Sequence, residues 1–110
     1  MLERMPTAFA LVAEPHRRRI LDLLREGERP VGELVAALHL AQPAVSKHLR
    51  ILREAGVVEA RVDAQRRLYR LRPEPLREVD AWLAPYRALW SGSLDALERR
   101  LDAIDDREER

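Results

Sequence analysis

Apolar residues recur at intervals of three and four in several stretches of this 110-residue chain, a spacing that places them on one face of an α-helix. In the first half this pattern predicts four helices, over residues 2–13, 16–25, 31–38 and 42–55. A link of three residues, 39–41, separates the third helix from the fourth. In the fourth helix Val45, Leu49 and Leu52 form the apolar stripe. Gly56 follows it, where a left-handed residue would end the helix.

The pattern changes to a period of two after the fourth helix, which is the spacing of a strand with one buried face. Val58, Ala60 and Val62 alternate with charged residues, and a second alternating run extends to Leu71. Together the two runs predict a β-hairpin over about 57–71. The residues that join them include no glycine, so we expect a loop longer than two residues, built around a type I turn.

A long helix is predicted for the last third of the chain, over about 76–104, and the charged tail after it (105–110) should fray. Its apolar positions recur in a spacing close to a heptad. A chain of this size has too small a core to cover such a helix, so the apolar seam calls for a second copy of the chain. The seam residues are Leu83, Tyr86, Trp90, Leu94, Leu97 and Leu101.

The predicted fold class is therefore mainly α with a small β-hairpin, in the order α-α-α-α-β-β-α, as a single domain over 1–110. Two helices joined by a tight turn and followed by a hairpin have the layout of a winged helix-turn-helix that reads DNA. The composition, 46% apolar and 35% charged, is ordinary for a helical globular protein.

Composition also excludes several function classes. The chain has no cysteine, which rules out disulfides and thiolate metal sites. It has no apolar run of about twenty residues and no basic segment leading into an apolar stretch at its start, so we expect no membrane contact and a cytoplasmic location. No nucleophile–base pair and no glycine-rich phosphate loop is present, so we expect neither enzyme activity nor a cofactor.

The net charge of +1 conceals an uneven distribution of charge. Residues 1–72 hold 14 Lys and Arg against 9 Asp and Glu, whereas residues 73–110 hold 6 against 10. A basic first part followed by an acidic last helix favours DNA binding over charges that segregate by chance. It also leaves an alternative open, a winged-helix interaction module that binds a partner protein through its acidic last helix.

Polar and cationic side chains lie off the apolar stripe of the fourth helix and along the hairpin. Gln42 and Ser46, near the start of the helix, suit base edges, and the cations suit phosphates. Arginines on the hairpin would lie where a wing meets the phosphate backbone or a minor groove. The predicted DNA-binding residues are Gln42, Ala44, Ser46, Lys47 and Arg50 on the helix and Arg61, Gln65, Arg66 and Arg67 on the hairpin.

The chain resembles the ArsR/SmtB family of bacterial winged-helix repressors, most clearly in the stretch Leu-Ala-Gln-Pro-Ala-Val-Ser-Lys-His-Leu-Arg-Ile-Leu-Arg-Glu-Ala-Gly-Val-Val at 40–58. The similarity covers roughly residues 8–101. It implies a homodimer that binds double-stranded DNA at an inverted-repeat operator, represses transcription and is released by an inducer. It also implies a dimer interface formed by the first and last helices, with Met5 and Phe9 on the first, and a phosphate contact by His48 in place of a merely solvated ring.

One departure from the family pattern concerns the helix cap. Ala41 stands where the family usually has a serine at the start of the reading helix, which should cost about 1 kcal/mol. A second departure concerns metals, because Pro30 and Gly32 stand at the positions of the family's Cys-x-Cys element and no histidine follows residue 48. The three histidines lie on three predicted elements without a clustered carboxylate, so we expect no metal site.

An effector, if release from DNA is ligand-driven, should be a small organic molecule. Trp82, Tyr86 and Trp90 recur at intervals of four on the last helix and would line its pocket. An aromatic stripe at helical spacing is also typical of a plain core or dimer interface. Control by the level of the protein alone is a further alternative.

Overall fold

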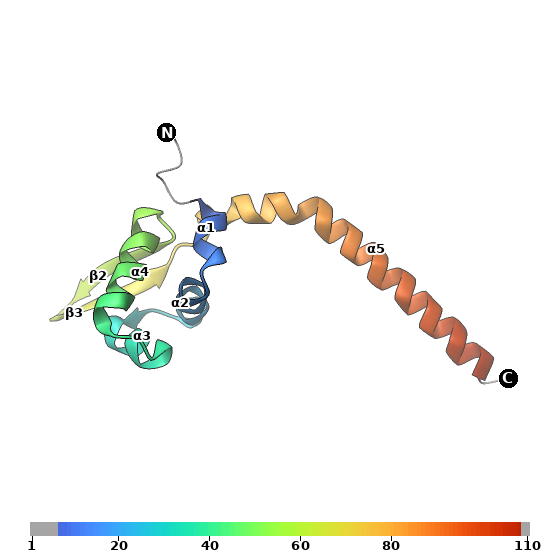
Figure 1. The fold of residues 1–110 in the computed structure, drawn as a ribbon, viewed down its shortest axis with the longest axis horizontal. Coiled ribbons are helices and arrows are strands. Elements are labelled where there is room, and N and C mark those ends of the chain that lie inside the picture. The colour runs from blue at the N-terminus through green and yellow to red at the C-terminus, as the bar shows by residue number, and fades with distance from the viewer. Residues whose placement is uncertain (1–6, 109–110) are drawn as a thin grey trace. The chain divides into compact units, whose positions relative to one another are not determined.

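A computed structural model describes residues 7–108 of the chain, with side chains through residue 105. The elements are α1 (Ala8–Ala13), α2 (Pro15–Glu26), β1 (Arg29–Pro30), α3 (Val31–Leu38), α4 (Gln42–Glu54), β2 (Val58–Asp63), β3 (Arg66–Leu71), the 3-10 helix η2 (Glu74–Leu76) and α5 (Arg77–Glu108). They form two compact units, one that ends at Glu78 and one that begins at Val79. The predicted mainly helical fold with a hairpin is confirmed (Figure 1). The predicted first helix agrees with α1 from residue 8 onward, and residues 2–6, including Met5, lie outside the described part.

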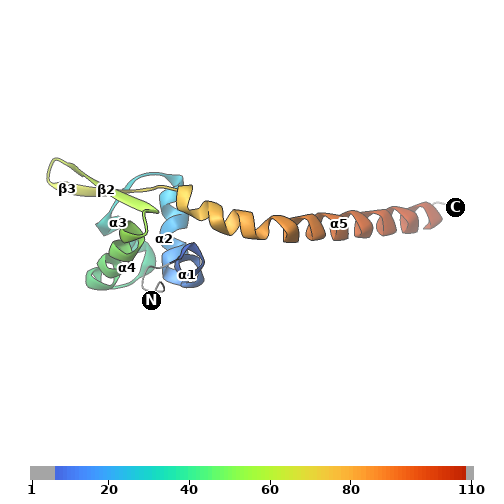
Figure 2. The ribbon, with the colours of Figure 1, turned by 90° about the horizontal axis from the view of Figure 1, so that it is seen from above.

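The core of the first unit is built from the apolar stripes of its helices. Its most deeply buried side chains are those of Leu11, Ile20, Leu34, Val45, Leu49, Leu52 and Val57, each less than 2% exposed. They come from α1 to α4 and from the residue that precedes β2, so the helices close around one small core. Figures 1 and 2 show the β2–β3 hairpin projecting outward from these helices as a wing.

A tight turn joins α3 to α4. His39 ends α3 in the left-handed region, with φ of 56°, and its N–H donates to the carbonyl of Val35 at 3.0 Å. A left-handed residue after the last helical turn is a common way to end a helix, although glycine or asparagine is usual there. Ala41 then precedes α4 in an extended conformation and its side chain makes no capping hydrogen bond, as the sequence predicts.

Gly56 ends α4 as predicted. Its φ is 81°, a left-handed conformation that glycine adopts without a steric penalty. The N–H of Gly56 donates to the carbonyl of Arg53 at 2.9 Å, and the N–H of Val57 donates to that of Leu52 at 3.1 Å. This pair of bonds is the Schellman motif, and it turns the chain directly from α4 into the wing.

The sheet has three antiparallel strands in the order β1-β3-β2, of which the sequence pattern predicts only two. The missing strand, β1, is two residues long and includes a proline, so it has no alternation to detect. The predicted hairpin loop was also wrong. Asp63 pairs with Arg66, which leaves a two-residue turn in which Ala64 has φ of 58°. The strand pairing imposes a left-handed conformation that glycine usually supplies.

Helix α5 continues without interruption through Pro85 and extends to Glu108. The helix therefore extends about four residues beyond its predicted end near 104. Large apolar side chains along the helix are exposed within the chain, between 41% and 67%: Trp82, Tyr86, Leu89, Trp90, Leu94, Leu97, Leu101 and Ile104. In the described part of the chain, no helix is both long and apolar enough to cross a membrane.

Candidate nucleic-acid interface

The outward face of α4 carries the side chains that the sequence predicts to contact DNA. Val45 and Leu49 are buried beneath the helix, which fixes the opposite face toward solvent. Four of the predicted residues are exposed there: Gln42, Ser46, Lys47 and Arg50. Ala44 is half-buried. Hydrogen-bonding groups near the helix N-terminus, with cations further along, suit base edges flanked by phosphates.

The tip of the wing carries the second predicted group. Gln65, Arg66 and Arg67 are all exposed around the two-residue turn. The nearest carboxylate oxygen to Arg66, on Asp63, is 3.8 Å from its guanidinium, too far for a strong hydrogen bond. The tip therefore offers cationic side chains that a phosphate could engage at little cost.

Arg61, further down the wing, already has a partner. Its guanidinium forms an ion pair with Glu28, with Nε 2.7 Å from Oε2. This hydrogen bond lowers the pKa of the Glu28 carboxyl. Arg61 thus differs from the arginines at the tip, because a phosphate would have to compete with a carboxylate for it.

Glu59 forms ion pairs with two more arginines, Arg70 on the wing and Arg72 just after it. Its carboxylate accepts hydrogen bonds from Arg70, which lies directly opposite on β3, and from Arg72 at 2.6 Å. The hydrogen bond from Arg72 lowers the pKa of the Glu59 carboxyl, and the bond from Arg70 acts in the same direction. These pairs lie on the surface, so the wing arginines without a close carboxylate within the described residues, Arg66 and Arg67, lie at its tip.

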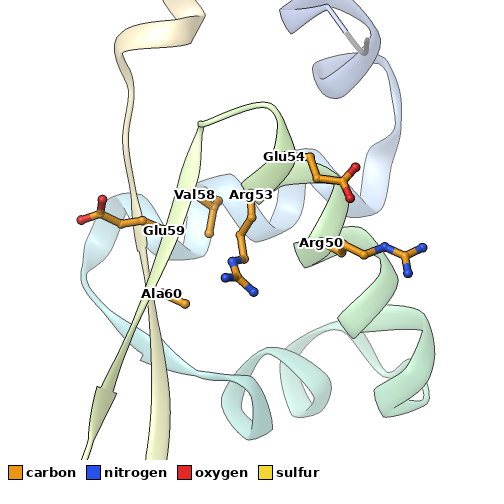
Figure 3. A pocket seen from close by; sticks show the side chains of 6 residues that line it. All are labelled: Arg50, Arg53, Glu54, Val58, Glu59 and Ala60. Carbon is orange, nitrogen blue, oxygen red and sulfur yellow. The ribbon is translucent and has the colours of Figure 1, made fainter. Parts of the chain in front are cut away.

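A surface hollow of about 490 Å³ lies between the C-terminal half of α4 and the start of β2. Figure 3 shows the guanidinium of Arg53 extending into the space between helix and strand, while that of Arg50 points away. Glu54, Glu59 and two small apolar residues complete the lining. The hollow is therefore lined by both charges, with Glu59 already bound to Arg70 and Arg72.

His48, on α4, lies beside residues of another helix, which the sequence did not predict. The ring of His48 is 5.7 Å from that of His16, measured between centroids, and its Nδ1 is 3.4 Å from Oε2 of Glu14. The expectation that the histidines have no clustered carboxylate was therefore wrong, because Glu14, His16 and His48 lie together. Only 18% of the His48 side chain is exposed, so its predicted phosphate contact would have to be made by this exposed part.

Glu14 holds this cluster at the start of α2. As the N-cap residue it accepts hydrogen bonds from the N–H groups of His16 and Arg17, at 2.9 and 3.1 Å. Burial alone would raise the pKa of the Glu14 carboxyl, but these bonds together hold it below its ordinary value. Burial lowers the pKa of His48 and so favours the neutral imidazole. The Glu14 carboxylate acts in the opposite direction, but its effect is smaller. An acidic residue before Pro15 is a recognisable cap signal, although nothing local predicts its contact with α4.

Those predicted interface residues that the structure describes lie on exposed surface, with one exception. Tyr86, Trp90, Leu94, Leu97 and Leu101 are exposed along α5, and Leu83 is half-buried. Phe9 on α1 is 39% exposed. The rings of Trp82 and Tyr86 contact each other in a tilted arrangement, with centroids 4.9 Å apart, so part of the predicted aromatic stripe is a ring pair within the helix.

Comparison with known proteins places this geometry in a family. The family model described as "Bacterial regulatory protein, arsR family" matches residues 14–60, from the α2 cap into β2. An arsenic resistance transcriptional regulator of Pseudomonas putida is 47% identical over 79 residues, which cover 71% of this chain and 62% of that protein. The transcriptional repressor SdpR of Bacillus subtilis is 32% identical over 79 residues, which cover 72% of this chain and 88% of the repressor.

The likeness extends to solved structures. A crystal structure of a possible transcriptional regulator for arsenical resistance is 40% identical and has a TM-score of 0.65, covering 72% of this chain and 82% of that one. The chain spans less than two thirds of the Pseudomonas regulator but most of SdpR. Sequence, element order and wing all agree, and the chain belongs to the ArsR family of bacterial winged-helix regulators.

Proposed function

We propose that this protein is a transcriptional regulator that binds double-stranded DNA sequence-specifically and acts as a repressor. The observation that carries the proposal is the exposed polar face of α4 beside a wing with exposed cations at its tip. Relatives named as transcriptional regulators and repressors support the same function. Because its partner is chromosomal DNA, we place its action in the cytoplasm.

In this proposal some residues contact base edges and others contact phosphates. Gln42 and Ser46 lie in the first two turns of α4, where a helix that enters the major groove reaches base edges. Lys47 and Arg50 hold phosphates from the same helix, and Arg66 and Arg67 hold them from the wing. Ala44 and Gln65 lie beside these groups and complete the contact surface.

We further propose that the active form is a homodimer through α5. Apolar side chains from residue 83 to residue 104 follow each other at intervals of three and four, and most are about half exposed or more. Such a seam is what two copies related by a two-fold axis bury against each other. Phe9 on α1, 39% exposed, would contact the partner chain from the first unit. A two-fold dimer reads an inverted repeat, one half-site to each reading helix.

The proposal also says where a small organic effector would bind. If a small organic molecule releases the protein from DNA, the Trp82–Tyr86 pair and Trp90 offer it aromatic surface on the proposed dimer helix. Ligand binding at that surface would act on the dimer before it acts on the reading helices.

The experiment that tests the function is a mobility-shift titration of the full chain against genomic fragments, beginning with the promoter of its own gene, at several salt concentrations. We expect one or a few fragments to bind well above the rest, with affinity that falls steeply as salt rises. Absence of binding to any fragment at low salt would contradict the proposal and favour a protein-interaction module.

A further inference from the structure

The DNA-binding proposal gives no use to the cluster formed by Glu14, His16 and His48. Glu14 caps α2, His16 lies in the first turn of that helix, and His48 lies in the middle of α4. One candidate ligand atom from each residue lies within 4.8 Å of the other two. The cluster thus brings two imidazoles and a carboxylate from separate helices to one point.

The distances in the cluster are close to those of a metal site. Nδ1 of His16 is 3.0 Å from Oε1 of Glu14, and Nδ1 of His48 is 3.4 Å from Oε2. When ligand atoms lie about 2.0–2.2 Å from a tetrahedral zinc ion, they are about 3.3–3.6 Å from one another. The three side chains would have to draw together from separations of at most 4.8 Å to hold an ion between them.

The cluster also holds a buried ring nitrogen that makes no hydrogen bond within the described part of the chain. Among the described residues, Nδ1 of His48 is buried without a hydrogen-bond partner, and its geometry toward Glu14 fails to make one. Buried polar atoms are nearly always paired, so such an atom calls for a partner. Oε1 of Glu14 is hydrogen-bonded to both the N–H and Nδ1 of His16, whereas Oε2 accepts only from the N–H of Arg17 and keeps a lone pair for a further partner.

We infer that Glu14, His16 and His48 bind one divalent transition-metal ion of the borderline class that includes Zn²⁺, Co²⁺ and Ni²⁺. Two imidazole nitrogens and one carboxylate oxygen form a donor set that zinc accepts with water in the remaining position. His16 is about half exposed, which provides an entry path from solvent. The positive charge of Arg17 acts on His48 and opposes a cation there, so we expect weaker binding than in a structural zinc site.

An ion at this position would join the start of α2 to the middle of α4. His48 lies 32 residues after His16 and 34 residues after Glu14, so only folding brings the three ligands together. The ion would therefore bind the folded chain and not the unfolded one. Metal should therefore raise the temperature of unfolding. This consequence does not depend on DNA binding, and its failure would leave the proposed regulator function untouched.

The test uses the full chain without an affinity tag. Co²⁺ is titrated while the visible absorption of the ion is followed, and Zn²⁺ is titrated by calorimetry. We expect one ion per chain and Co²⁺ bands typical of fewer than six ligands. His16→Gln removes one ligand from an exposed position, and it should weaken binding by about tenfold or more. The matched control is His39→Asn, which removes the third histidine and keeps a residue that tolerates its left-handed backbone.

Thermal unfolding with and without Zn²⁺ gives a second readout. The metal should raise the unfolding temperature of the wild type and of His39→Asn, and should leave that of His16→Gln unchanged. The site is refuted if the wild type binds no ion stoichiometrically, or if His16→Gln binds it as tightly as the wild type does.

Discussion

The guanidinium of Arg61 donates two hydrogen bonds to the carboxylate of Glu28, at 2.7 and 2.8 Å. Arg61 lies on β2, and Glu28 lies in the link between α2 and β1, 33 residues earlier in the sequence. The pair therefore joins the wing to the helical part of the first unit. It also means that one of the arginines predicted to contact phosphate is held by an anion of the protein itself.

Replacing Glu28 by glutamine should strengthen DNA binding. The change removes the carboxylate that competes with phosphate for Arg61, so the affinity should rise and its dependence on salt should steepen by about one unit. Glu26→Gln is the matched control, because it removes the same charge from a residue that pairs with Arg29 instead. Equal effects of the two variants in a salt-dependent binding assay would show that Arg61 does not contact phosphate.

The wing tip should contribute equally to the affinity for DNA of any sequence. Changing Arg66 and Arg67 together to alanine removes two proposed phosphate contacts, so the salt slope should flatten by about one unit for each. Operator and random duplexes should be weakened alike, because phosphates carry no sequence information. Arg25→Ala, an exposed change on α2, serves as the charge control. An unchanged slope in the double variant would mean that the wing tip does not touch DNA.

The α5 seam should hold the dimer together. Leu97→Glu places a charge in a position that is 53% exposed in one chain and buried in the proposed dimer, so it should produce monomers and weaken operator binding. Ala96→Glu adds the same charge on the same turn, off the seam, and should remain dimeric. Light scattering after size-exclusion chromatography measures both. A wild-type monomer at micromolar concentration would contradict the dimer and the inverted repeat with it.

One substitution at the start of α4 should increase the stability of the protein. Ala41 has the extended backbone of an N-cap, with φ of −66° and ψ of 148°, but no side-chain oxygen. In Ala41→Ser the hydroxyl can accept from the N–H of Ala44, which at present donates only to the carbonyl of residue 41 at 3.0 Å, and the free energy of unfolding should rise by up to about 1 kcal/mol. Thr7→Ala removes an existing cap, in which Oγ1 accepts from the N–H of Ala10, and should lower it similarly. Urea unfolding checks both signs, and an Ala41→Ser protein no more stable than wild type would disprove the cap argument.

The helix-turn-helix and its wing could be predicted because their signals are local. The stripe of Val45, Leu49 and Leu52 repeats at the helical period, and Gly56 marks the end of the helix. The exposed face of α4 follows from the same stripe, since burying one side of a helix presents the other to solvent.

The remaining features could not be predicted because they depend on contacts between distant segments. Pairing with β3 makes a strand of Arg29 and Pro30, and the same sheet imposes the left-handed conformation of Ala64. Nothing in the spacing of His16 and His48 shows that α2 crosses α4 where their rings meet. Sequence periodicity reports which face of an element is buried, but not what lies opposite it.

The central claim is that α4 reads base sequence, and selection from a library of random duplexes tests it most directly. The wild-type chain should enrich an inverted repeat and bind it about a thousandfold or more tighter than random DNA. Gln42→Ala should lose on the order of 1–3 kcal/mol on that sequence and little on random duplexes. Selection that enriches no sequence, or a Gln42→Ala variant that enriches the same sequence with the same affinity, would contradict the claim.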